Sequence, residues 1–155
     1  MNTTAEALRQ RSFDFAVKAV KLTRYLSETK QAWVLARQVL RSGTSIGANI
    51  REARFAQSKA DFISKLSIAL KEASETQYWL ELLFASELLT TEQYGFLKPD
   101  VDWLVGTLVN VIKASKRNMK SPDVDLNLRN GNYPPTGGFA ANPPSPVLKA
   151  AQPPI

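Results

Sequence analysis

Apolar residues recur with the spacing of an α-helix over about six turns of the segment that follows Ser58. The positions that share one face are Phe62, Leu66, Ala69, Ala73, Leu80 and Phe84. Ser58 and Asp61 stand before this run in a variant of the capping box, which predicts where the helix begins. A helix with so long an apolar face cannot bury that face alone, so the chain must pack helix against helix.

Three further segments have helical periodicity, and no segment sustains the period-two alternation of a strand. We expect helices at about residues 3–27, 32–54, 59–88 and 91–118. Ser12 offers an alternative start for the first of them, at Phe13, and Pro99 predicts a kink or a new start in the last. Short connections between long helices predict an all-α, up-down-up-down antiparallel four-helix bundle.

The composition changes sharply after Lys120. The last 35 residues contain eight of the nine prolines. Such a segment does not bury enough apolar surface to offset the entropy lost on ordering, so we expect a bundle over residues 1–120 and a disordered tail over 121–155. A proline-rich ligand for an aromatic groove is the functional alternative for this tail, although its proline pairs lack a clean spaced motif.

The chain contains neither histidine nor cysteine. Zinc fingers, thiol nucleophiles, Ser-His-Asp triads and helical di-metal sites all need one of these side chains. We therefore expect no enzyme activity, no metal, no cofactor and no small-molecule substrate. No apolar stretch approaches the ~20 residues that cross a bilayer, and a signal peptide is not evident, so the sequence predicts a cytoplasmic protein without a membrane partner.

Residues 37–53 separate into three stripes when they are wound as a helix. Arg37, Arg41 and Arg51 lie nearly opposite the apolar stripe, and a ridge of Ser45, Asn49 and Glu52 lies between the two. The apolar stripe contains Leu35, Val39, Ile46, Ile50 and Ala53. Gly43 and Gly47 each cost ~1 kcal/mol relative to alanine inside a helix. Close approach by another helix or another subunit would offset that cost.

This stretch carries a family resemblance. The segment Arg41-Ser-Gly-Thr-Ser45-Ile46-Gly-Ala-Asn49-Ile50-Arg-Glu52-Ala53 resembles the signature Arg-x-x-x-Ser-Ile-x-x-Asn-Ile-x-Glu-Gly of the bacterial four-helix bundle proteins encoded in intervening sequences of 23S ribosomal RNA genes. The segment from Ser58 to Leu80 is similar to the third helix of that family. The resemblance covers about residues 12–118, and it departs from the common pattern at Ala53 and at Gly43-Thr44.

The resemblance implies a left-handed four-helix bundle that assembles as a pentameric ring. It also implies kinship with the accessory variability protein of diversity-generating retroelements, for which nucleic-acid binding is proposed. Most members of the family have no established activity, so the resemblance bears on the fold and the assembly more than on the function.

Charge is unevenly distributed along the chain. Residues 1–60 contain eleven lysines and arginines against four acidic residues, whereas residues 61–97 contain two against six. One hypothesis is non-specific binding of RNA or DNA phosphates by cations of the first two helices. These cations are Lys18, Lys21, Arg24, Arg37, Arg41, Arg51 and Arg54. Readout of bases is not supported, because no aromatic residue is clearly interleaved with these cations.

The second hypothesis is a structural or protein-interaction assembly in which the arginines pair with the acidic third helix of a neighbouring copy. A further apolar set on that helix, Tyr78, Trp79, Leu82 and Leu83, predicts an oligomer contact in either case. The polar ridge could line a ligand surface, but a role in fixing the register of a helix seam is favoured. Its specific form would be Glu52 paired with an arginine of a neighbouring chain.

Overall fold

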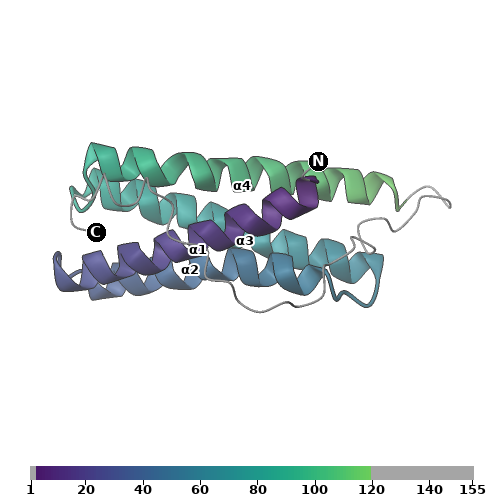
Figure 1. Cartoon of the computed structure of the whole chain (residues 1–155), viewed down its shortest axis with the longest axis horizontal. Coiled ribbons are helices and arrows are strands. Elements are labelled where there is room, and N and C mark those ends of the chain that lie inside the picture. Colours follow the sequence, from purple (N-terminus) through teal and green to yellow (C-terminus); the bar gives the residue numbers. More distant parts are fainter. Residues whose placement is uncertain (1–2, 120–155) are drawn as a thin grey trace.

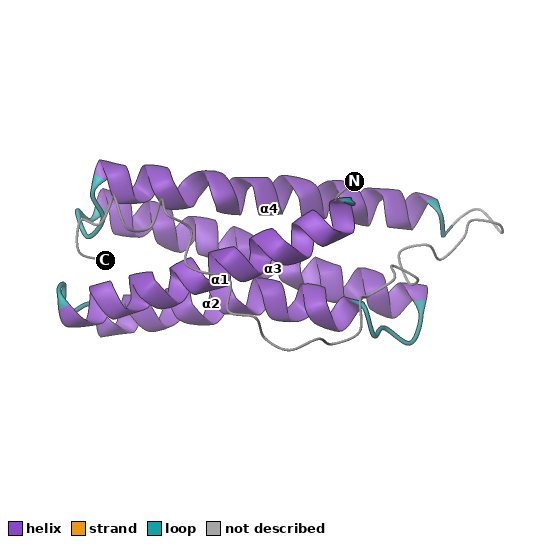
Figure 2. Cartoon of the chain, viewed as in Figure 1, coloured by secondary structure: helices purple, strands orange, loops and turns teal. Residues whose placement is uncertain are grey.

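The computed structural model describes residues 3–119, and these form a four-helix bundle. The helices are α1 (Thr4–Glu28), α2 (Trp33–Ala53), α3 (Lys59–Ala85) and α4 (Thr91–Arg117). Consecutive helices run in opposite directions, and α1 lies obliquely to the others (Figure 1). Helices joined by short loops account for residues 3–119, so the predicted all-α, up-down-up-down architecture is confirmed (Figure 2). The predicted disordered tail over 121–155 lies outside the described residues.

Side-chain caps fix the beginnings of three helices. Thr3 and Glu6 form a reciprocal capping box at the start of α1, and Thr90 and Gln93 do the same for α4. The Ser58 hydroxyl accepts the Asp61 backbone N–H at 3.1 Å. The alternative start of the first helix at Phe13 is therefore wrong. Ser12 is buried within α1, where its hydroxyl donates to a backbone carbonyl rather than capping a terminus.

Pro99 lies inside α4, so the expected new start at this residue is also wrong. A proline in a helix removes one hydrogen bond and crowds the carbonyl four residues earlier, which here belongs to Gly95. Both Pro99 and Gly95 are exposed. Water can reach the carbonyl that loses its partner, and a glycine adds no side chain to the crowding. These features explain why the helix continues.

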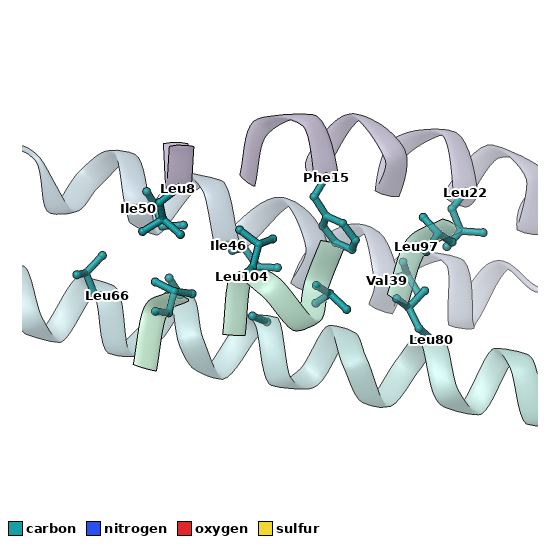
Figure 3. Packing of buried hydrophobic residues seen from close by; sticks show 14 of the residues in the cluster. Leu8, Phe15, Leu22, Val39, Ile46, Ile50, Leu66, Leu80, Leu97 and Leu104 are labelled. Carbon is teal, nitrogen blue, oxygen red and sulfur yellow. The ribbon is translucent and has the colours of Figure 1, made fainter. Parts of the chain in front are cut away.

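The core consists of layers contributed by all four helices (Figure 3). Leu8, Ile50 and Leu66 lie together toward one end, and Leu22, Val39, Leu80 and Leu97 lie toward the other. The buried face of α3 differs from the predicted face at its two ends. Ile63 and Leu83 are buried, whereas Phe62 is only partly buried and Phe84 lies on the surface, stacked on Tyr94 at a centroid distance of 4.4 Å.

Candidate nucleic-acid interface

The two basic helices, α1 and α2, approach closely because α2 has glycines at the contact. A Cβ atom added to Gly43 would lie 2.8 Å from the Ala19 Cβ, and one added to Gly47 would lie 3.4 Å from the Ser12 carbonyl oxygen. This contact confirms the prediction that another helix packs closely against the glycines. It also joins the outward sides of α1 and α2 into one surface.

The structure divides the predicted cations into two groups. The first group contains cations that form ion pairs with acidic residues of other helices. The Lys18 ammonium lies 2.5 Å from an Asp100 carboxylate oxygen on α4. The Arg41 guanidinium pairs with Glu75 of α3, and a second carboxylate, from Glu72, lies 3.9 Å away. Lys18 and Arg41 therefore face the seams with α4 and α3 and contribute little to a phosphate-binding surface.

The second group consists of cations on the outward sides of α1 and α2. Arg24, Arg37 and Arg51 are exposed and Lys21 is partly exposed, and none of the four forms an ion pair with any residue of the described range 3–119. Arg37 and Arg51 are separated by about 21 Å along α2, at 1.5 Å per residue. Arg54 lies at the end of this helix, with its guanidinium carbon 5.3 Å from the centroid of the Phe55 ring.

Exposed aromatic side chains accompany these cations, which the sequence analysis missed. Phe13 of α1 is 50% exposed and Trp33 of α2 is 63% exposed. Helical spacing could have revealed both. Trp33 precedes Arg37 by one turn, and Phe13 shares an outward strip with Val17, Val20 and Arg24 at spacings of three and four residues. The expectation that no aromatic residue is clearly interleaved with these cations is therefore wrong.

A cleft of about 170 Å³ opens between the outward sides of α1 and α2. Two arginines, Arg9 and Arg51, and Phe13 line it, and no acidic residue of the described range 3–119 does. The remaining lining residues are Ser12, Ala16, Thr44, Gly47, Ala48 and Ile50. Most of these side chains are small, and Gly47 has none.

A second cleft, of about 370 Å³, lies at the end of the bundle where the first turns of α1 meet the last turns of α4. Its lining is mainly apolar and includes Leu8, Phe62 and Val111, with Arg9 and Arg54 among the polar members. This cleft exists because α1 packs mainly on α2 and makes fewer contacts with α4.

Comparison with known proteins agrees with this fold. A model of the family described as 23S rRNA-intervening sequence protein matches residues 6–110. The chain belongs to this family. A crystal structure of a protein of unknown function from the S23 ribosomal protein family of Bacteroides thetaiotaomicron is 50% identical, with a TM-score of 0.70 over 72% of this chain and 99% of that one. No curated protein matches the chain.

In this member of the 23S rRNA-intervening sequence protein family, the polar ridge forms one bond within α2 and one across the α2–α3 seam. Asn49 donates from Nδ2 to the Ser45 carbonyl at 2.9 Å. The Glu52 carboxylate lies 2.6 Å from the Lys65 ammonium of α3, and this bond raises the pKa of Lys65. The predicted partner of Glu52, an arginine of a neighbouring chain, is thus replaced by a lysine of the same chain, because Lys65 lies directly across the α2–α3 seam.

The predicted oligomer contact is reduced by one residue. Leu83 is fully buried in the core, so it is unavailable to a neighbouring copy. Tyr78 is 57% exposed, and Trp79 and Leu82 are partly buried. The Trp79 indole donates to Glu75 at 3.0 Å, and this bond, followed by the contact with Arg41, holds the pKa of Glu75 below its ordinary value of 4.5.

Residues 3–119 contain neither a metal-binding cluster of side chains nor a membrane-spanning helix. No group of three or more acidic side chains there could hold a metal ion. Over the same range, each helix is too short or too polar to cross a membrane.

Proposed function

We propose that this protein is a non-enzymatic, homo-oligomeric bundle that binds RNA or DNA non-specifically through the outward sides of α1 and α2. The observation that carries the proposal is a set of four cations that have no counter-ion among residues 3–119, namely Lys21, Arg24, Arg37 and Arg51. Exposed cations attract phosphate, and phosphate contacts supply most of the affinity in non-specific binding. The family description refers to 23S rRNA, and the Bacteroides relative is assigned to a ribosomal protein family, which suits an RNA partner.

Assembly of several copies would strengthen this binding. Tyr78 exposes an aromatic ring on α3, and Leu82 lies one turn beyond it, so this side of α3 supports contact with another copy. The family resemblance suggests a pentameric ring. Several basic surfaces facing one nucleic acid would then act together through a high effective concentration, provided that they face the same side.

The alternative is an assembly without a role in nucleic-acid binding. The ion pairs of Arg41 with Glu72 and Glu75 favour this alternative. They are an example of an α2 arginine that pairs with carboxylates of α3. In this alternative, Arg24, Arg37 and Arg51 would meet the acidic surface of a neighbouring copy.

A salt titration of RNA binding tests the proposal. The change is the triple variant Arg24→Gln, Arg37→Gln and Arg51→Gln, with binding of a structured RNA followed by fluorescence anisotropy. Each phosphate contact contributes about 0.7–0.9 to the slope of log affinity against log salt concentration. We expect the slope of the triple variant to fall by about 2, while the mass by light scattering stays that of the wild-type oligomer.

Arg41→Gln is the matched control, because it removes a charge from the same helix that already has carboxylate partners. Its slope should remain close to that of the wild type. If the triple variant dissociates the oligomer while the residual RNA signal keeps its slope, the arginines join subunits and the alternative function is correct. A wild type that has a single-chain mass would contradict the homo-oligomer.

A further inference from the structure

The cleft between α1 and α2 combines two features that phosphate binding alone does not need. The half-exposed Phe13 lines the cleft, together with the small residues Ala16, Gly47 and Ala48. Apolar surface of this kind gives no advantage for a phosphate, which is bound by cations and N–H groups. The cleft is therefore suited to a ligand that has a flat apolar part as well as a negative charge.

The charge and the size of the cleft restrict the class of ligand further. Arg51 lines the cleft, and no carboxylate of residues 3–119 does, so the cleft favours an anionic ligand. The volume of about 170 Å³ exceeds by several-fold the ~30 Å³ that one water molecule occupies in the liquid. The site thus has room for a ring system beside the aromatic side chain. A nucleotide with an unpaired base has this combination of a flat apolar face and an adjacent phosphate.

We propose that this cleft binds one unpaired nucleotide of a single-stranded nucleic acid, with the base stacked on Phe13 and the adjoining phosphate held by Arg51. This inference rests on the proposed nucleic-acid binding and makes it more specific. In a duplex the base faces are covered by neighbouring pairs, so a duplex can use the arginines but not the phenylalanine. Stacking on an aromatic ring tolerates any base, which is consistent with binding that does not depend on sequence.

The geometry also explains why Gly47 is important for the site. An alanine there would place a Cβ at 3.4 Å from the Ser12 carbonyl oxygen, at the tight limit of ordinary contact, and Gly47 also lines the cleft. Glycine at this position lets α1 lie close and adds no side chain beside the cleft. The same residue thus serves the packing of the helices and the shape of the ligand site.

The test compares two probes on the full-length protein. One is a single-stranded oligouridylate of about 20 nucleotides, which exceeds the site size of common single-strand-binding folds, and the other is an RNA duplex of the same length. We expect Phe13→Ala to weaken binding of the single strand by about tenfold, within the range measured for loss of a stacked base, and to leave duplex binding unchanged. Arg51→Gln should weaken both, since both have phosphates.

Phe96→Ala is the matched control. Phe96 is 39% exposed and lies 3.9 Å from the Lys18 ammonium, so it also combines an exposed ring with a cation, but on the side of the bundle formed by α1 and α4. Its removal should not affect either probe. Phe13→Trp provides a second readout, because a base stacked on the new indole should quench its fluorescence while single-strand affinity is retained.

Four outcomes decide the matter. Selective loss of single-strand affinity in Phe13→Ala supports the site. Equal binding of both probes by the wild type and by Phe13→Ala would overturn it while leaving phosphate binding intact. A lower mass for Phe13→Ala would show that the cleft is a contact between copies, and would also overturn it. Absence of any binding by the wild type at low salt would reject the proposed function together with this site.

Discussion

Replacement of Phe15 by alanine is expected to lower the free energy of unfolding by about 3–5 kcal/mol. Phe15 is 1% exposed and lies in the middle of the core layers (Figure 3). Removal of its ring deletes contacts with several helices and leaves a cavity that rigid helices close only in part. Urea denaturation followed by circular dichroism, at one fixed protein concentration, measures the change.

Phe13→Ala is the internal reference for this prediction, because the same substitution is made two positions away on the same helix. Phe13 is half-exposed, so its loss should cost less than ~1 kcal/mol. If the two variants had equal stability, the orientation of α1 in the bundle would be wrong. A shift of the urea midpoint without a change in the slope of unfolding free energy against urea would show that unfolding exposes as much surface in the variant as in the wild type.

Gly43→Ala is expected to destabilise the fold by about 1–2 kcal/mol, although alanine is the better helix former. The added Cβ would meet the Ala19 Cβ at 2.8 Å, and neither atom lies at the end of a flexible side chain. Relief therefore requires the backbones of α1 and α2 to separate. That separation also disturbs the neighbouring hydrogen bond in which the Thr76 hydroxyl donates to the Ser42 hydroxyl at 2.9 Å across the buried α2–α3 contact.

Replacement of Gly106 by alanine should stabilise the fold instead of destabilising it. A Cβ added there meets no atom within 4 Å, and the residue is exposed within α4. Alanine should therefore raise the free energy of unfolding by about 0.5–1 kcal/mol, since it restricts the unfolded chain and favours the helix. Denaturation of the two variants side by side separates helix propensity from close packing. A stabilising effect at both positions would contradict the tight α1–α2 contact.

Helical periodicity predicted the bundle well because the apolar faces of its helices are long. It placed the core of α2 through Val39, Ile46 and Ile50, all of which are buried. The face of α3 was predicted less well at its ends. That helix is apolar on more than one side, so the pattern alone could not decide between Phe62 and Ile63 or between Leu83 and Phe84. Packing against α4, where Phe84 stacks on Tyr94, determines which of these side chains is buried.

The candidate site was harder to predict, because its properties depend on pairs of residues from different helices. Lys18 and Arg41 have the outward positions and the charge of a phosphate-binding residue. Their partners, Asp100, Glu72 and Glu75, are 31 to 82 positions away along the chain and could not be assigned from spacing. The exposure of Phe13 could have been predicted from helical periodicity, since Phe13 falls opposite Leu8 and Phe15 on the helix.

Proline at position 99 shows a limit of local rules of a different kind. The rule that proline ends a helix describes the cost of a lost hydrogen bond and of a steric contact. In α4 the residue four positions earlier is an exposed glycine, which reduces both costs. The tertiary contacts of Leu97 and Val101 on the other side of the helix are buried and hold the segment in place.

The uneven packing of α1 affects how the chain reaches its folded state. Because α1 packs on α2, α2 on α3 and α3 on α4, most tertiary contacts join helices that are adjacent in sequence, and the α1–α4 contact that closes the bundle is the smallest. Proteins with such local contacts fold within microseconds to milliseconds. We expect the helical hairpins to form first and the α1–α4 seam to close last. The first turns of α1, beside the cleft that this seam leaves open, should then exchange their amide hydrogens sooner than the middle of the bundle.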